Sequence, residues 1–295
     1  MAAATTTSKI IPCSAGWFAR KADSQPKEIV LSIGIKELME SGVHFGHQTK
    51  RWNPKMKKFI FEARNGIHII DLSKTLTQLE AACAFMSDIV GKGSEVLFVG
   101  TKKQAQAAVK EAAKSCGQLY VTERWLGGTL TNFNTVKRSL ARLRELEKWE
   151  VDGTLAKYGK QEQSVLRRET ARLVKNLDGI RTLQKFPAAM FVVDVKREHN
   201  AVAEARRLKI PLVAISDTNS DPDIVDFPIP GNDDAIRSVR LILSIVVQTL
   251  TQARAEYESK YGRRKQVEEV APTEAPAPAA EAPAPVTEAP AASPA

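Results

Sequence analysis

Short apolar segments that alternate with helical segments constrain the fold of this chain more than any other feature of its sequence. The segments apolar enough for buried strands are residues 95–99, 119–122, 189–193 and 212–215. Residues 103–116 form an Ala-rich helical segment that Gly117 ends, and residues 199–208 form another. Strands that alternate with helices of roughly 10–15 residues build right-handed βαβ units, so the sequence predicts an α/β fold around a parallel sheet.

Further elements are expected on both sides of this core. They are helices over 35–41 and 75–90, short strands over 59–61 and 67–70, and a final helix from Asp233 to about Tyr261. Asn65-Gly66 lies between the two short strands, but the expected connection is longer than a tight hairpin. The final helix opens with two acids at its positive end, which stabilises the helix dipole.

Residues 130–181 do not fit the sheet pattern and are expected to form a separate helical hairpin. Two narrow apolar stripes with helical spacing define its arms, namely Phe133, Val136, Leu140 and Leu143, then Leu166, Thr170, Leu173, Leu177 and Ile180. Two such helices, joined by the loop 153–159, make an antiparallel coiled coil. A helix of about 20 residues is about 30 Å long, so this hairpin should protrude from the α/β domain. The charged faces of both arms either contact a partner or are merely solvated.

The two ends of the chain differ in composition from the part between them. Five Glu and no Lys or Arg follow residue 267, so residues 1–267 hold all 43 Lys and Arg against 29 acids, a net charge of +14. A basic body with an acidic tail favours a polyanionic partner, most often a nucleic acid. We expect a disordered N-terminal extension over 1–28, the α/β domain over 29–129 and 182–262, and a disordered Ala/Pro/Glu-rich acidic tail over 263–295. Residues 1–28 also have weak transit-peptide character.

Sequence motifs for catalysis and for cofactor binding are absent. Gly100-Thr101-Lys102-Lys103 follows a predicted strand but lacks the first glycine and the length of a phosphate loop, so it predicts only a helix start whose N–H groups could bind a phosphate. Residues 217–223 mimic the start of a calcium loop, but Pro222 stands where a glycine is needed, so its aspartates are expected to cap turns. No serine-hydrolase order occurs, and the sequence predicts no enzyme and no catalytic residue.

The chain also lacks the patterns of a membrane span, a disulfide framework and a zinc site. No stretch approaches about 18 unbroken apolar residues. Cys13, Cys83 and Cys116 are widely separated. His44 and His47 have a spacing that metal ligands use, but two further ligands cannot be placed, so hydrogen-bonded, partly buried imidazoles are favoured and no metal ligand is assigned.

Two segments combine cations with aromatic residues and glycines in the manner of RNA-binding loops. Residues 50–64 hold six Lys and Arg against one acid, together with Trp52, which offers a stacking surface beside a phosphate-tracking loop. Residues 123–132 hold Arg124, Trp125 and a Gly127-Gly128 pair, where the backbone could approach a partner closely. Packing between sheet and hairpin is an equal alternative for Trp125.

Several long motifs resemble the bacterial-type ribosomal protein S-two family. They are residues 38–47 (LMESGVHFGH), 51–56 (RWNPKM), 65–71 (NGIHIID), 97–102 (LFVGTK), 124–128 (RWLGG), 187–194 (PAAMFVVD) with Glu198-His199, 217–223 (DTNSDPD) and 230–235 (PGNDDA). They stand in the family's order, and the resemblance covers residues 35–249. The N-terminal extension is longer than the family usually shows, and the acidic tail carries no function over from it.

The resemblance implies a flavodoxin-like parallel sheet flanked by helices, with a protruding antiparallel coiled-coil hairpin. It implies a structural, non-catalytic protein of the small ribosomal subunit that binds small-subunit ribosomal RNA and helps to dock the messenger-binding ribosomal protein S-one. The ribosome would be bacterial and cytoplasmic or, given the N-terminal extension, organellar, with no cofactor, membrane or small-molecule substrate involved. The cations and the aromatic residue expected to contact RNA are Lys50, Arg51, Trp52, Lys55, Lys57, Lys58, Arg64, Lys102, Lys103, Arg124, Lys137, Arg138 and Arg142. A free RNA-binding regulator and a nucleotide-binding enzyme remain the alternatives.

Overall fold

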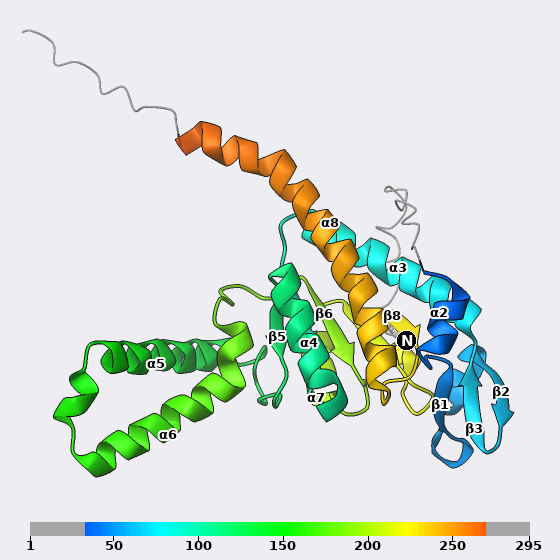
Figure 1. Cartoon of the computed structure of the whole chain (residues 1–295), viewed down its shortest axis with the longest axis horizontal. Helices are drawn as coiled ribbons and strands as arrows, with labels where there is room; N and C mark the ends of the chain where they lie inside the picture. Colours follow the sequence, from blue (N-terminus) through cyan, green and yellow to red (C-terminus); the bar gives the residue numbers. More distant parts are fainter. Residues whose placement is uncertain (1–32, 270–295) are drawn as a thin grey trace, which may run out of the picture. The chain divides into compact units, whose positions relative to one another are not determined.

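The computed structural model of the protein describes residues 33–269 (Figure 1). Contacts divide the chain into two units, residues 1–257 and 258–295, and the elements below belong to the first unit except for the end of the last helix. The disorder predicted over 1–28 and the part of the predicted tail after residue 269 lie outside the described residues.

Five parallel strands form the central sheet of the first unit. In spatial order they are β5 (Leu119–Val121), β4 (Val96–Val99), β6 (Ala189–Val193), β7 (Leu212–Ser216) and β8 (Phe227–Pro230). Counted along the chain, this order is 2-1-3-4-5, which is the order of flavodoxin-like sheets. Every residue of β4, β6 and β7 is buried, as expected for strands covered on both faces. The predicted α/β fold with a parallel sheet is confirmed.

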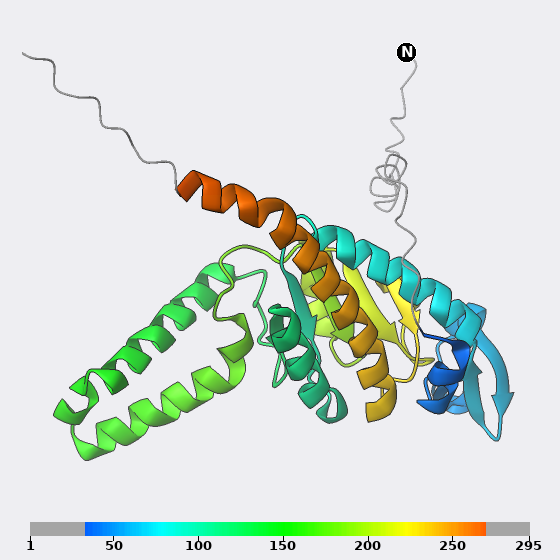
Figure 2. The same ribbon diagram turned by 45° about the horizontal axis from the view of Figure 1, so that its top comes forward.

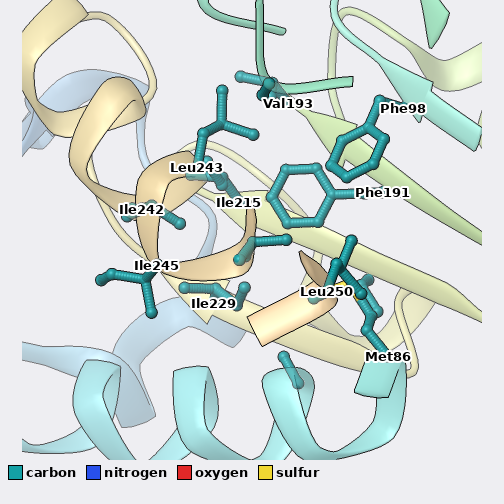
Figure 3. Close-up of a cluster of buried hydrophobic side chains, with 14 of the residues drawn as sticks. Met86, Phe98, Phe191, Val193, Ile215, Ile229, Ile242, Leu243, Ile245 and Leu250 are labelled. Carbon is teal, nitrogen blue, oxygen red and sulfur yellow. The ribbon is translucent and has the colours of Figure 1, made fainter. Parts of the chain in front are cut away.

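Helices cover both faces of this sheet and enclose two apolar cores. They are α2 (Ile35–Glu40), α3 (Leu72–Val90), α4 (Lys103–Cys116), α7 (His199–Arg207) and α8 (Ile236–Glu269). Because successive strand side chains point to opposite faces, Phe98 and Phe191 join the core under α3, α4 and α8, part of which Figure 3 shows. Leu97 and Met190 join the opposite core, under α7 and the base of the helical hairpin. Figure 2 shows α3, α4 and the first part of α8 along one face of the sheet.

A second, antiparallel sheet of three strands precedes the central one. Its order is β1 (Phe45–Gln48), β3 (Ile67–Ile70), β2 (Ile60–Arg64). β2 runs to Arg64, so only Asn65 and Gly66 connect it to β3, with φ angles of 52° and 76°. Two central residues with positive φ make the tight hairpin turn typical of Asn-Gly, so the longer connection expected from the sequence is wrong. β1 was not predicted, because its glycine and polar residues carry no strand pattern.

The helical hairpin consists of α5 (Phe133–Val151), the short helix η4 (Thr154–Lys157) and α6 (Lys160–Leu177). α5 and α6 contact each other and run side by side in Figures 1 and 2. Four residues of α5 are buried, from Val136 to Leu146, but Leu177 is the buried residue of α6. The two helices are therefore where the sequence predicts them, while coiled-coil packing between them stays a prediction.

The ends of two further segments differ from the sequence expectation. α8 begins at Ile236 rather than Asp233, because the Asn232 side chain accepts the N–H groups of Asp234 and Ala235 and holds them in a turn. It continues to Glu269, beyond Tyr261. β8 was not predicted, because its segment contains two prolines, and it occupies the edge of the sheet, where proline costs no ladder bond.

Candidate nucleic-acid interface

The basic segment, residues 50–64, exposes its cations, while buried side chains and hydrogen bonds hold its backbone in place. Met56 and Phe59 are buried beneath it, and the backbone N–H of Asn53 donates to the carbonyl oxygen of Thr218 at 2.8 Å. The Asn53 side chain caps the next turn by accepting the N–H of Lys55 at 3.0 Å. The exposed cations of the segment are Lys50, Arg51, Lys55, Lys57, Lys58 and Arg64. Trp52 is half-buried, with its ring centroid 5.0 Å from that of His68.

Two of these six cations are partly neutralised by the turn after β7. Lys55 Nζ lies 2.8 Å from a carboxylate oxygen of Asp221 and 3.1 Å from one of Asp223, and Lys58 Nζ lies 3.8 Å from Asp223. Burial would raise the pKa of Asp221, but its hydrogen bonds from Lys55 and the Asp223 backbone N–H, together with the charge of Lys55, outweigh burial and lower that pKa. Within the described chain, no carboxylate lies in salt-bridge range of the other four cations, so their charge is not neutralised from within.

The loop 123–132 is held by hydrogen bonds to one carboxylate, which was not predicted from the sequence. Glu204 of α7 accepts the indole N–H of Trp125 at 3.0 Å and the backbone N–H groups of Gly128, Leu130 and Thr131 at 2.8, 3.0 and 3.1 Å. Burial would raise the pKa of Glu204, but these hydrogen bonds outweigh it, and the pKa is lowered. No local pattern links Glu204 to the loop, because the partners lie more than 70 residues apart.

The hydrogen bonds to Glu204 hold Trp125 in the interior, whereas Arg124 of the same loop is exposed. The Trp125 side chain is 7% exposed and belongs to the core between sheet and hairpin, so packing is the correct reading of its two alternatives. Arg124 and Gly127 face solvent on the same loop. An added Cβ at Gly127 would meet nothing within 4 Å, which leaves its backbone open to a partner.

The predicted cations of α5 lie on its exposed face. Lys137 Nζ lies 4.6 Å from the ring centroid of Phe133, and Arg138 is exposed one position further on. Arg142 is more engaged, since its guanidinium lies 5.1 Å from the Trp149 ring centroid and 3.6 Å from a carboxylate oxygen of Glu169. Lys137 and Arg138 are therefore the more accessible pair.

Lys102 and Lys103, adjacent in sequence, occupy different environments. Lys103 is exposed at the start of α4. Lys102 is buried, and its Nζ lies 2.7 Å from Asp233 Oδ1 and 3.7 Å from Asp194 Oδ2 at the carboxyl ends of the strands. Burial would lower the pKa of Lys102, but its bonds to Asp233 and Asp234 outweigh it and raise that pKa. This placement gives no support to an RNA contact by Lys102.

The start of α4, whose N–H groups could have bound a phosphate, is occupied by the protein's own Glu198. Glu198 accepts the backbone N–H of Thr101 at 3.0 Å and also its hydroxyl. Arg197 Nε donates to the same hydroxyl at 3.2 Å. An internal carboxylate thus takes the place of a bound anion just before α4, where a flavodoxin-like sheet has its topological switch point.

His47 lies in a group of acids beside this edge. Its Nδ1 is 3.0 Å from Asp217 Oδ2, and its Nε2 is 3.1 Å from the amide nitrogen of Asn219. The bond with Asp217 raises the pKa of His47 despite burial. His47, Asp217 and Asp233 offer ligand atoms within 4.8 Å of one another and could hold a metal ion, the one such group in the part of the chain that the structure describes. His47 is hydrogen-bonded as predicted, whereas Nδ1 of His44 has no partner in the described residues.

Comparison with known proteins identifies the architecture that carries these surfaces. The sequence model of the family described as ribosomal protein S2 matches residues 38–253, which include both sheets, the hairpin and the first half of α8. The chain belongs to the ribosomal protein S2 family. It is 49% identical over 237 residues to the small ribosomal subunit protein uS2 of Treponema pallidum subsp. pallidum, and equally to that of the Nichols strain of Treponema pallidum, covering 80% of this chain and 81% of each relative.

Family membership fixes the class of protein. A ribosomal protein S2 is a component of the small ribosomal subunit, so this chain is a ribosomal protein that serves translation and is not an enzyme. None of the described helices is long and apolar enough to cross a membrane.

Proposed function

We propose that the protein is a structural constituent of the small subunit that binds small-subunit ribosomal RNA through its basic segment, the Arg124 loop and the first hairpin arm. The observation that carries this proposal is the set of exposed cations without a carboxylate partner in the described chain, Lys50, Arg51, Lys57 and Arg64, beside the half-buried ring of Trp52. Such cations bind phosphates and release counterions, which makes affinity fall with salt. Lys103, Arg124, Lys137 and Arg138 extend the surface, and Lys55, Lys58 and Arg142 join it if RNA displaces their carboxylate partners.

The same proposal assigns residues 29–129 and 182–262 to the α/β domain and 130–181 to a protruding coiled-coil hairpin. It places the protein on a bacterial ribosome in the cytoplasm, with an organellar ribosome as the alternative that the N-terminal extension suggests.

The test is incorporation into small subunits followed across a salt series. Lysates with wild-type protein or the Lys50→Gln/Arg51→Gln variant are separated on sucrose gradients at several salt concentrations. We expect wild-type protein to co-sediment with the small subunit, and the variant to leave it at lower salt. Lys114→Gln, at the exposed last turn of α4, is the matched control and should behave as wild type. Equal retention of all three proteins would overturn the RNA surface, and a wild-type peak at the top of the gradient would favour a free regulator.

We further propose that the small sheet supports docking of ribosomal protein S-one. Phe45 on β1, Phe61 on β2 and Ile67 on β3 are 49%, 74% and 37% exposed, an unusual concentration of large apolar side chains on three adjacent strands. Phe61→Ser should lower the amount of ribosomal protein S-one recovered with small subunits, while incorporation of the chain itself is unchanged. An unchanged amount would remove this part of the proposal.

A further inference from the structure

Two phenylalanine rings form a small aromatic platform where the hairpin meets the central sheet. Phe133 is the first residue of α5, and Phe186 lies in the loop that leads into β6. Their ring centroids are 5.3 Å apart, with the ring planes inclined by 41°. Phe133 packs against the second apolar core, whereas Phe186 does not belong to it and is 53% exposed. One ring therefore supports the other and leaves it open to solvent.

Three exposed cations lie on the two segments that carry this platform. Lys137, one turn after Phe133, holds its Nζ 4.6 Å from the Phe133 ring centroid. Lys185 precedes Phe186 and is exposed, as is Arg138. The loop itself is anchored to the start of β4, since the backbone carbonyl oxygen of Glu95 accepts the N–H of Ala188 at 2.9 Å. Lys137 on α5 and Lys185 in the loop thus supply an exposed cation on each of the two segments that carry the rings.

The platform is continuous with the loop that Glu204 holds. Thr131, whose N–H and hydroxyl donate to Glu204, lies two residues before Phe133. The hydrogen bonds to Glu204 therefore fix the start of α5, and with it the position of Phe133 beside Phe186. A preformed position is what a stacking site requires, because the ring does not have to be ordered at the moment of binding.

The exposed apolar area favours a single base over a protein partner. Among the described residues, the other large exposed apolar side chains belong to α2, the small sheet, the hairpin beyond its base and the start of α8. Phe186 has no such neighbour in its own loop or on α7. A protein interface buries a patch of many residues, whereas one nucleobase needs one aromatic face and cations for the adjoining phosphates.

We propose that an unpaired base of small-subunit ribosomal RNA stacks on Phe186, and that Lys137 and Lys185 hold the flanking phosphates. This inference rests on the RNA-binding function proposed above and adds to it a base-stacking residue. Stacking is indifferent to base identity, so Phe186 contributes affinity for an unpaired strand rather than readout of a sequence.

The experiment uses small subunits assembled without this protein and free of ribosomal protein S-one, to which the purified full chain is added back. Affinity is measured for wild type, Phe186→Ala, Phe186→Trp and the control Met39→Ala, which removes an exposed apolar side chain on α2. Nucleotide mobility in the ribosomal RNA is followed by 2′-hydroxyl acylation. Unfolding midpoints of the free variants confirm that each one folds.

We expect Phe186→Ala to bind on the order of 10-fold more weakly and to raise the acylation of an unpaired nucleotide. Phe186→Trp should retain both the affinity and the protection, and Met39→Ala should match wild type. Phe186→Ala removes no charge, so its salt dependence should equal that of wild type, whereas Lys137→Gln should lower the slope by about 0.7.

The other possible outcomes distinguish a failure of the stacking site from a failure of the proposed RNA-binding function. Salt-dependent wild-type binding with an unaffected Phe186→Ala variant overturns the stacking site and leaves the proposed function in place. Weaker binding of Phe186→Ala without any change in nucleotide acylation assigns the ring to a neighbouring protein and also overturns it. Absence of wild-type binding overturns both.

Discussion

The carboxylate of Glu204, on α7, accepts the indole N–H of Trp125 at 3.0 Å, although the two residues are 79 positions apart in the chain. The same carboxylate accepts three backbone N–H groups of that loop, at Gly128, Leu130 and Thr131. It therefore links the sheet to the start of the hairpin and positions the exposed Arg124. A single side chain holds a surface that we assign to RNA.

Glu204→Gln should lower the free energy of unfolding by about 2 kcal/mol. The amide keeps one acceptor oxygen but turns a donor group toward N–H groups that then lack a partner, and each buried unsatisfied donor costs about 1–3 kcal/mol. The midpoint of urea unfolding measures the change. Glu111→Gln, on the exposed face of α4, is the control and should stay within about 0.5 kcal/mol of wild type. Equal midpoints for both variants would show that the loop does not need this carboxylate.

The pH dependence of stability should distinguish Glu204 from Glu198. Hydrogen bonds outweigh burial and lower the pKa of Glu204, so its stabilisation is present above the unfolded pKa, about 4.3, and is lost as pH falls through the folded pKa. Burial raises the pKa of Glu198 in spite of its bonds from Thr101, so the folded state binds the extra proton and gains stability as pH falls. The advantage of wild type over Glu204→Gln should hold from pH 7 down to about pH 4.3 and shrink only below that pH, whereas the stability of wild type relative to Glu198→Gln should already rise as the pH falls towards about 4.3. Parallel pH profiles for the two variants would contradict both assignments.

The parallel sheet could be predicted from the sequence, because strands such as residues 189–193 are buried on both faces and are apolar throughout. Gly117 ends α4, as predicted, with a φ of 63°. β1 was missed because Phe45–Gln48 is a strand only through its pairing with β3, which depends on residues more than 15 positions away. Local pattern carries no information about such pairing.

The candidate site shows the same division. A run of cations in residues 50–64 predicts an exposed basic surface, and the structure places all six on the outside. The difference between Lys102 and Lys103 was not predictable, because Asp194 and Asp233 reach Lys102 only through the order of the strands. Composition identifies cations, and topology decides which of them are already paired.

Lys102→Met should be far more destabilising than Lys103→Met. The first change removes the counter-charge of Asp233, which is fully buried and whose pKa burial raises to about 7. The buried group is then left as an unpaired carboxylate or has to take up a proton, and breaking a buried pair in this way costs up to about 3–5 kcal/mol. The second change affects an exposed side chain and should cost no more than about 0.5 kcal/mol. Urea unfolding of the two variants at pH 7 makes the comparison. Equal stabilities would mean that the ammonium of Lys102 does not compensate the carboxylates, and would return Lys102 to the set of RNA contacts.

Gly179→Ala should loosen the junction between the hairpin and the sheet. A Cβ on Gly179 would lie 2.0 Å from the carbonyl oxygen of Tyr120 and 2.5 Å from its ring, so the backbone after α6 has to move. That movement would also strain the bond from the Tyr120 hydroxyl to Asp178, now 2.8 Å. Overpacking of this kind costs about 1–3 kcal/mol or more, and thermal unfolding should show it as a lower midpoint.

Gly127→Ala separates this steric effect from the general effect of replacing a glycine. Nothing lies within 4 Å of an added Cβ at Gly127, so the free protein should unfold at the wild-type midpoint. If the Gly127 backbone approaches RNA closely, this variant should nevertheless incorporate less well into small subunits, whereas Gly179→Ala should lose both stability and incorporation. A stable Gly179→Ala protein would show that the hairpin base is not packed as tightly as the 2.0 Å approach requires.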